Sequence, residues 1–389
     1  MNEATLQYIR QHLNDDVPTL ALKKAPVGTD VSLALRQIEA RQLLQKKAPE
    51  WASNERLLFP ARVSIEQGSS EATAHYKAKL LKGDTFADLT GGLGIDTYYL
   101  SQHFAKADYV EAQAELCELA RHNFNVLQTP IAVHNETAEH FLAHCGTYDC
   151  LYLDPSRRDA HGRKTVAIAD CAPNVADLQD LLLQKAETVI IKLSPMLDIS
   201  QALNALRHVK EIHVVAVANE CKELVSRLER GFYGLTELCC ANIETLQPAL
   251  RFTLDEERNC PLKLAETIGR YLYEPNAALL KAGCFRLPAK WFDVGKLHPS
   301  SHLYTSDTLV ARFPGRVFEV EGWATYNKKV RNGLLAGTEK ANLAVRNFPM
   351  GTEELRKSLK MSDGGNIYLF ATTLCNGEKV IVKTKKAAP

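Results

Sequence analysis

The segment Thr85-Phe-Ala-Asp-Leu-Thr-Gly-Gly-Leu-Gly-Ile-Asp-Thr97 constrains the fold more than any other part of the chain. An apolar run leads into a loop with three glycines, and the loop leads into a helical pattern. Glycine lets the chain turn tightly and lets a ligand approach bare backbone, while the helix that follows offers unpaired N–H groups. The segment therefore predicts the first strand, loop and helix of a doubly wound α/β domain.

The same alternation of short apolar runs and helical stretches continues to about residue 243, which is typical of a parallel sheet with crossover helices. The expected strands are Thr85–Leu89, Asp108–Glu111, Ile131–His134, Cys150–Asp154, Thr188–Leu193, Ile212–Ala218 and Thr236–Ile243. Helices are expected between them, including one over Cys221–Arg230. These elements predict a Rossmann-like α/β fold with a seven-stranded sheet.

The regions on either side have a different pattern. Residues 1–82 carry helical spacing without a strand signal and predict a helical N-terminal domain, which precedes the α/β domain expected over 83–247. Prolines punctuate short pieces over 248–315, where we expect a connecting domain. Residues 316–389 mix strand and helix patterns and predict a small α+β C-terminal domain.

The 389 residues carry a net charge of only +1, which gives no whole-chain electrostatic case for a nucleic-acid or membrane partner. The distribution is uneven, because the chain from Leu280 to the end has 18 Lys and Arg against 9 Asp and Glu. An acidic body of charge −8 therefore precedes a basic tail of charge +9.

Several classes of protein are disfavoured by the composition. No apolar run approaches the about 18–20 residues of a membrane span, and the N-terminal sequence does not resemble a signal peptide. The ten cysteines form no Cys-x-x-Cys pair and lie in apolar runs, as reduced thiols of a cytoplasmic protein do. No His-Glu-x-x-His motif and no zinc-finger spacing is present, so no metal site is expected.

The glycine loop and the second expected strand together indicate a nucleoside ligand. Glu111 ends that strand, where a carboxylate accepts hydrogen bonds from a ribose diol. The dinucleotide fingerprint needs a glycine where the chain has Thr97, and Asp88 would repel a pyrophosphate but suits an amine or a sulfonium. These features favour S-adenosylmethionine. The alternatives are a nicotinamide dinucleotide and a loop that only packs a helix on a strand.

A second polar constellation follows the fourth expected strand, in Tyr148-Asp-Cys-Leu-Tyr-Leu-Asp-Pro-Ser-Arg157. Ligands of open α/β sheets bind at the carboxyl ends of the strands, so Asp154 is expected to face the reactive end of the cofactor. Lys192 ends the fifth strand at the same edge, where it could contact substrate or extend to solvent. Ser69 or Ser70 is expected to cap a helix that precedes the first strand.

These motifs together resemble class I S-adenosylmethionine-dependent methyltransferases, in particular the bacterial group with a THUMP-like C-terminal domain. The resemblance covers about residues 65–243, and residues 272–386 are similar to the ferredoxin-like and THUMP-like tail of that group. It implies S-adenosylmethionine as the cofactor and a catalytic motif of Asp154, Pro155, Ser156 and Arg157. The cofactor-binding residues that it implies are Asp88, Thr90, Gly91, Gly92, Gly94 and Asp96 in the loop, Glu111 at the ribose, and Asn135, Glu136 and Thr137 at the adenine.

One departure from the pattern concerns the substrate. Relatives that methylate amino groups carry Asp/Asn-Pro-Pro and then an aromatic residue that stacks on a flipped base, whereas this chain has Ser156 and Arg157 there. The Asp-Pro-Pro-Arg pattern of pyrimidine C5 methyltransferases is nearer, but those enzymes need a nucleophilic cysteine, and the fifth strand carries none. The methylated atom is therefore left open.

The basic tail suggests an RNA partner. Its cations include Lys328, Lys329, Arg331 and Arg346, and the aromatic residues Trp323, Tyr326 and Phe348 are interleaved with them. Cations neutralise phosphates and aromatic faces stack unpaired bases, which suits tRNA or rRNA. The sequence thus predicts a methyltransferase for an RNA base; the alternatives are an RNA- and cofactor-binding protein without turnover, and a methyltransferase for a protein or small molecule.

Overall fold

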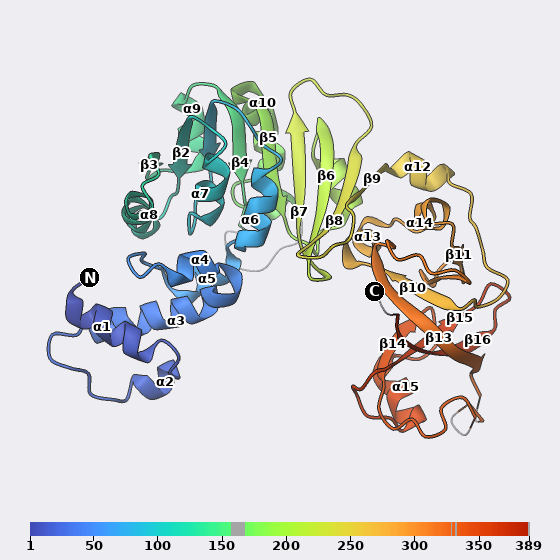
Figure 1. The fold of residues 1–389 in the computed structure, drawn as a ribbon. Helices are drawn as coiled ribbons and strands as arrows, with labels where there is room; N and C mark the ends of the chain where they lie inside the picture. Colours follow the sequence, from blue (N-terminus) through green and yellow to red (C-terminus); the bar gives the residue numbers. More distant parts are fainter. Residues whose placement is uncertain (157–167, 328, 331–332, 388–389) are drawn as a thin grey trace. The chain divides into compact units, whose positions relative to one another are not determined.

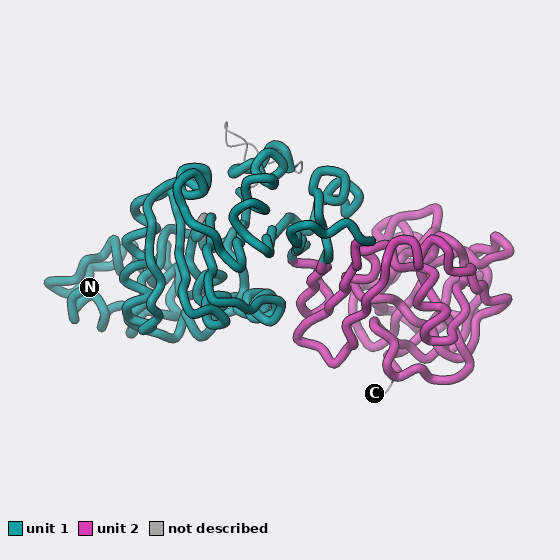
Figure 2. Tube along the Cα trace, turned by 90° about the horizontal axis from the view of Figure 1, so that it is seen from above, with its two compact units in different colours: residues 1–212, 223–235 teal, residues 213–222, 236–389 magenta. Residues whose placement is uncertain are grey.

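The computed structural model describes residues 1–156, 168–327, 329–330 and 333–387. The chain forms two compact units, shown in different colours in Figure 2. One unit contains residues 1–212 and 223–235, and the other contains residues 213–222 and 236–389. Figure 1 labels helices and strands of both units.

The N-terminal region is helical, as the sequence predicts. Its helices are α1 (Glu3–His12), α2 (Val17–Leu20), α3 (Val31–Lys47), α4 (Pro49–Ser53), α5 (Arg62–Gln67) and α6 (Glu71–Ala78). The side chain of Asp30 caps α3 by accepting from the Leu33 N–H, and α3 ends where Pro49 prevents its continuation. Ser70 caps α6 in the same way, so one of the two expected capping serines is confirmed.

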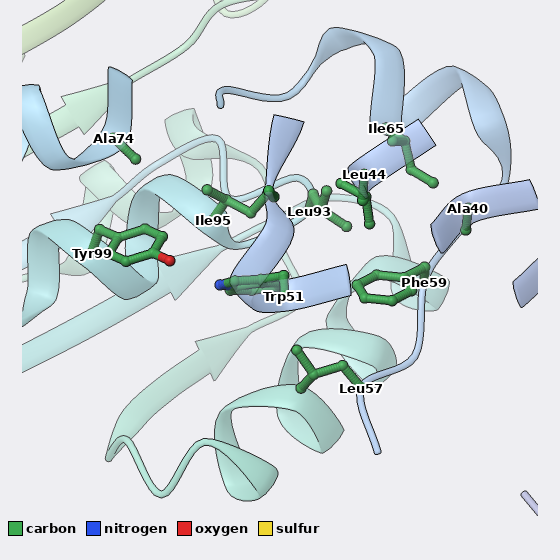
Figure 3. Packing of buried hydrophobic residues seen from close by; sticks show 11 residues of the cluster. Ala40, Leu44, Trp51, Leu57, Phe59, Ile65, Ala74, Leu93, Ile95 and Tyr99 are labelled. Carbon is green, nitrogen blue, oxygen red and sulfur yellow. The ribbon is translucent and has the colours of Figure 1, made fainter. Parts of the chain in front are cut away.

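A hydrophobic cluster packs these helices against the glycine loop. Trp51 is 1% exposed and lies between Phe59 and Tyr99, as Figure 3 shows. The cluster consists of Ala40, Leu44, Ala48, Trp51, Leu57, Phe59, Ile65 and Ala74 together with Leu93, Ile95 and Tyr99. Because Leu93 belongs to the loop and Ile95 begins the helix after it, the N-terminal helices support the loop from outside the sheet.

The large sheet has nine strands among the described residues, in the order β3-β2-β1-β4-β5-β7-β6-β8-β9. They are β1 (Thr85–Asp88), β2 (Lys106–Val110), β3 (Ile131–His134), β4 (Tyr148–Leu153), β5 (Ala186–Leu193), β6 (Val209–Val217), β7 (Glu220–Glu229), β8 (Glu237–Ile243) and β9 (Leu250–Thr253). Strands β1 to β5 pair in parallel, whereas β7 is antiparallel to β5. The crossover helices are α7 (Ile95–Ser101), α8 (Ala114–Val126), α9 (Ala138–His144), α10 (Val175–Lys185) and α11 (Ile199–Ala205), and a short 3-10 turn covers Ile168–Asp170.

Two expectations about this sheet are wrong. The sheet exceeds the seven strands predicted, and the segment expected to be the helix Cys221–Arg230 is strand β7. The chain turns between β6 and β7 through Ala218 and Asn219 alone, both at positive φ (48° and 71°). Two such residues form the tight turn that a hairpin requires. The charged side chains at 223, 227 and 229 imitate a helical pattern, but ion pairs accommodate them within the strand.

The other unit contains a seven-stranded sheet of order β11-β12-β10-β13-β16-β15-β14. Its strands are β10 (Tyr271–Pro275), β11 (Gly295–Lys296), β12 (Tyr304–Ser306), β13 (Gly315–Thr325), β14 (Asn342–Arg346), β15 (Ile367–Thr373) and β16 (Lys379–Lys386). Its helices are α12 (Leu254–Asn259), α13 (Ala277–Ala282), α14 (Leu287–Trp291) and α15 (Thr352–Leu359). All pairs are antiparallel except β14 with β15. The core of this sheet includes Leu272, Phe318, Phe370 and Val382.

No helix in the described part of the chain is long and apolar enough to cross a membrane. All ten cysteines lie in the described ranges, and each is a free thiol.

We expect Trp51→Ala to destabilise the unit that carries the glycine loop by about 3–5 kcal/mol, because it removes a large side chain from a closed cluster. Urea unfolding followed by circular dichroism measures the loss. Leu22→Ala is the control, since Leu22 is 89% exposed and its truncation should change the unfolding free energy by less than about 0.5 kcal/mol. Equal effects of the two substitutions would contradict a supporting role for the helices.

Candidate active site at the carboxyl edge of the sheet

The carboxyl ends of β1, β2, β4 and β5 meet at one edge of the large sheet. The strand order reverses at β1, which has β2 on one side and β4 on the other. Such a switch point leaves room for a ligand above the strand ends. The residues that follow these strands include Glu111, Asp154 and the glycine loop, so the structure brings the expected motifs to the same edge.

The glycine loop is pressed against β2. A Cβ added to Gly91 would lie 2.2 Å from the ring of Tyr109, and the Gly91 N–H donates to the carbonyl oxygen of Val110 at 2.9 Å. Gly92 and Gly94 have positive φ values of 53° and 85°, which side-chain-bearing residues rarely adopt. The Tyr109 hydroxyl donates to the carbonyl oxygen of Gly92 at 2.7 Å. Packing alone therefore requires glycine at 91, and Gly92 is the partly exposed glycine of the loop.

Glu111 is joined directly to the loop. One carboxylate oxygen accepts from the Gly92 N–H at 3.0 Å, and the other accepts from the Gln113 N–H at 2.9 Å. Each oxygen keeps a second lone pair, so the carboxylate can still accept hydrogen bonds from a ligand. The Asn135 amide donates to the carbonyl oxygens of Glu111 and Ala112, both at 3.0 Å, and thereby fixes the chain after β2.

The other two residues expected at the adenine serve local structure. The Thr137 hydroxyl caps α9 by accepting from the His140 N–H at 3.2 Å. The carboxylate of Glu136 is turned toward His140 and His144, one and two turns along α9. Their ligand atoms lie within 4.8 Å of one another, a group that could hold a metal ion. The two histidines stand four residues apart, a spacing that the sequence-based expectation of no metal site wrongly took to be absent.

Asp88 lies beneath the loop with its carboxylate enclosed. It is 1% exposed, and its oxygens accept from the Thr90 N–H at 3.0 Å and from the Thr97 hydroxyl at 2.6 Å. Burial raises the pKa of Asp88 to about 7 against the lowering effect of these two hydrogen bonds. The structure thus gives Asp88 the role of holding the loop to α7, and its charge is less available to a ligand than the sequence suggests.

Asp154 is a partly exposed acid at this edge of the sheet. Its side chain is 30% exposed, and one oxygen lies 2.5 Å from the ammonium nitrogen of Lys192. The Asp154 N–H donates to the Thr90 hydroxyl at 2.6 Å, which ties the Asp-Pro-Ser segment to the glycine loop. Burial lowers the pKa of Lys192, but nearby carboxylates, that of Asp154 first, outweigh this effect and raise it above its ordinary value. Lys192 is therefore protonated at neutral pH.

Ser156 of the Asp-Pro-Ser-Arg motif is held by backbone hydrogen bonds. The Ser156 N–H donates to the carbonyl oxygen of Ala172 at 2.8 Å, and the Ala172 N–H donates back at 3.2 Å. Pro155 lies between this bridge and Asp154. Arg157 lies outside the described residues.

A buried ionic network lies behind the Asp154–Lys192 pair. Lys77 of α6 is fully buried and contacts Asp96 at 3.1 Å and Glu223 of β7 at 3.0 Å. Asp96 also accepts from the Tyr152 hydroxyl at 2.7 Å and from the Ser69 hydroxyl at 2.6 Å. Asp96, expected among the cofactor-binding residues, is thus placed in a structural network.

Sequence reasoning missed the other members of that network. The missed residues are Lys77, Ser69 as a linking side chain, and Glu223. Lys77 was considered only as the end of the segment whose serine caps a helix, and Glu223 as part of a helix start. Glu223 meets Lys77 because residues 220–229 form strand β7, where the sequence pattern predicts a helix.

The predicted RNA-binding residues lie in the other unit. Arg346 binds Glu274, a side chain that is 3% exposed and that also pairs with Arg316. Lys329 is exposed, whereas Lys328 and Arg331 lie outside the described residues. Two of the three aromatic residues are engaged internally, because the rings of Tyr326 and Phe348 contact each other and pack on a hydrophobic cluster.

Comparison with known proteins identifies the family. The chain is 35% identical to a candidate methyltransferase from Porphyromonas gingivalis W83, over 99% of this chain and 98% of that one, with a TM-score of 0.88. A ferredoxin-like domain model matches residues 271–314, and a THUMP domain-like model matches residues 315–386. This chain belongs to the class I methyltransferase group with a THUMP-like C-terminal domain.

More distant likenesses concern smaller parts of the chain. M. capricolum TrmK bound to S-adenosyl-homocysteine is 13% identical over 41% of this chain and 69% of that one, with a TM-score of 0.33. A Pyrococcus abyssi tRNA (uracil-54, C5)-methyltransferase is 16% identical over 45% of this chain and 40% of that one, with a TM-score of 0.31. Scores this low carry no weight for the site. Comparison with curated proteins gives no match.

We expect Gly91→Ala to destabilise the protein by about 1–3 kcal/mol, because the new methyl group must displace the Tyr109 ring or the loop. Gly146→Ala is the matched control, since a Cβ there meets nothing within 4 Å. The difference in unfolding free energy between the two variants, from urea titrations, measures the packing constraint. If both variants match the wild type, the close approach of the loop to Tyr109 is not rigid.

Proposed function

We propose that this chain is an S-adenosylmethionine-dependent methyltransferase that acts on RNA. The observation that carries the proposal is the carboxylate of Glu111 bound to the Gly92 N–H, at the same sheet edge as the Asp154–Lys192 pair. A ribose-binding acid and an acid–lysine contact at the same sheet edge suit a nucleoside that carries a transferable group. Membership of the methyltransferase group supports the same reading.

The residues present fit this cofactor. S-adenosylmethionine has no phosphate, and the loop is bordered by the carboxylates of Glu111 and Asp154, which would repel one. The free lone pairs of Glu111 suit the ribose hydroxyls, and the partly exposed backbone of Gly92 suits close approach of the methionine part. When bound, the cofactor supplies an electrophilic methyl group. The chain then has to orient the accepting atom and exclude water, which positioning can achieve.

We assign Asp154 to the accepting atom and the other motif residues to substrate binding. Its carboxylate and the backbone before Pro155 offer acceptors that can orient an amine or a hydroxyl. Ser156 and Arg157 complete the motif in this proposal. Thr90, bonded to the Asp154 N–H, keeps the cofactor loop and the motif in register.

The RNA partner is supported by charge and by the THUMP domain-like match. The chain from Leu280 onward carries a charge of +9, which suits a polyanion. Lys328, Lys329 and Arg331 form the run of cations that we assign to phosphate contacts. We further propose the division into domains 1–82, 83–247, 248–315 and 316–389, with the last as the RNA-binding domain.

Glu111→Ala should weaken binding of S-adenosyl-homocysteine at least tenfold in isothermal titration calorimetry, because it removes the ribose acceptor. Glu118→Ala is the control, since that glutamate is exposed on the adjacent helix α8. If the wild-type chain fails to bind and a nicotinamide dinucleotide binds instead, the proposal is wrong.

Methyl transfer identifies the substrate. Labelled methyl groups should pass to RNA from a strain that lacks the gene, and Asp154→Ala should abolish the transfer while cofactor binding persists. Transfer to protein that survives ribonuclease treatment would favour the alternative substrate class. Cofactor and RNA binding with no transfer to any substrate would favour the binding protein without turnover.

A further inference from the structure

Three side chains at helix α9 converge on the surface of the unit that carries the glycine loop. Glu136 precedes the helix, and His140 and His144 follow one and two turns later. Nδ1 of His140 contacts one oxygen of Glu136, and Nε2 of His144 lies 3.7 Å from the other oxygen. Ligands held about 2.0–2.2 Å from a tetrahedral zinc ion lie roughly 3.4 Å from one another, so these side chains need only small rotations to bind one ion.

The backbone determines which nitrogen of His144 faces Glu136. Nδ1 of His144 lies 2.8 Å from the carbonyl oxygen of His140. A carbonyl oxygen can only accept, so Nδ1 carries a hydrogen and, in the neutral ring, Nε2 carries the lone pair. Histidines that bind metals commonly donate their other ring N–H to such a carbonyl, which fixes the tautomer and the orientation of the ring.

A third histidine approaches the same carboxylate in the same way. Nε2 of His134 donates to Asp108 at 2.6 Å, and Asp108 also accepts from the Tyr148 hydroxyl at 3.1 Å. The neutral His134 ring therefore has its lone pair on Nδ1, which lies 4.0 Å from the Glu136 oxygen that His144 approaches. Two nitrogen acceptors thus lie near one carboxylate oxygen, and a cation between these groups would be attracted by all of them.

A metal ion accounts for this cluster better than a proton does. A proton joins two atoms, whereas Glu136, His140 and His144 each bring a ligand atom within 4.8 Å of the other two. Two imidazoles and one carboxylate are a ligand set of zinc that leaves a fourth position for water. The side chains of His140 and His144 are 73% and 54% exposed, so an ion can enter from solvent.

We propose that Glu136, His140 and His144 bind a zinc ion. The ion joins the chain after β3 to the last turn of α9. Asn135, the neighbour of Glu136, donates to the carbonyl oxygens of Glu111 and Ala112, so the ion also steadies the segment beside the acid that we assign to the ribose. Zinc binding here does not depend on methyl transfer, and it engages the carboxylate that the family resemblance places at the adenine.

Zinc titration of the full chain, first stripped of metal with a chelator, tests the site. Isothermal titration calorimetry should show one equivalent of Zn²⁺ bound, and His140→Ala and His144→Ala should each weaken binding at least about tenfold. His103→Ala is the matched control, since His103 is an exposed histidine of the same unit outside the cluster, and it should leave the affinity unchanged. Wild-type affinity in both cluster variants, or no binding by the wild type, would overturn the proposal.

Cobalt substitution distinguishes this site from metal binding by cysteine. Cys375 is an exposed thiol, and a thiolate bound to Co²⁺ gives an intense charge-transfer band in the near ultraviolet. Nitrogen and oxygen ligands should instead give only the weaker visible bands of tetrahedral Co²⁺, and these bands should disappear in His140→Ala. A charge-transfer band that His140→Ala leaves unchanged would assign the metal to thiols and overturn the site.

Stability measurements separate metal binding from damage to the fold. The two histidines are exposed, so the zinc-free double variant His140→Ala with His144→Ala should have the circular dichroism spectrum of the zinc-free wild type. Zinc should raise the unfolding temperature of the wild type but not of the double variant, because an ion that binds only the folded state stabilises it. An equal rise in both would contradict the site.

The zinc site and the proposed function fail separately. If the zinc-free wild type does not bind S-adenosyl-homocysteine, the proposed function is wrong and the zinc site is unaffected. If the wild type binds S-adenosyl-homocysteine but no zinc, the zinc site is wrong and the proposed function is unaffected.

Discussion

The ion pairs of the fully buried Lys77 are the interaction on which the unit that carries the glycine loop depends. An ion removed from water is tolerated only when opposite charges and hydrogen bonds surround it, and Lys77 has Asp96, Glu223 and Ser69 as partners. These partners come from α7, from β7 and from the chain that enters α6. One charge thus joins the N-terminal helices, the helix after the glycine loop and the centre of the sheet.

The N-terminal helices consequently belong to the chemistry of the site. Their cluster around Trp51 packs on Leu93 of the glycine loop, and the segment that enters α6 supplies Ser69. These helices therefore do more than cover the site. Their hydrophobic cluster supports the glycine loop, and Ser69 contacts Lys192 at the edge of the sheet.

The sequence predicted the parts of the fold that depend on local chemistry. The glycine loop and the acid at Glu111 were found because tight turns and strand ends have distinctive residues. Strand β7 was missed because charged residues in a central strand are tolerated only through partners distant in sequence, as Glu223 is by Lys77. The two-residue turn at Ala218 and Asn219 carried a weak signal, since alanine seldom adopts a positive φ. The burial of Asp88 likewise depends on packing that no single motif reveals.

The ion pairs of Glu274 have a consequence for nucleic-acid affinity. Arg316 and Arg346 are both satisfied by this carboxylate, so fewer cations are available to polyanions than a count of residues suggests. Each phosphate neutralised by a protein cation releases counterions, and the ionic-strength dependence of association reflects the number released. Affinity for a polyanion should therefore decline less steeply with added electrolyte than the formal excess of positive residues implies.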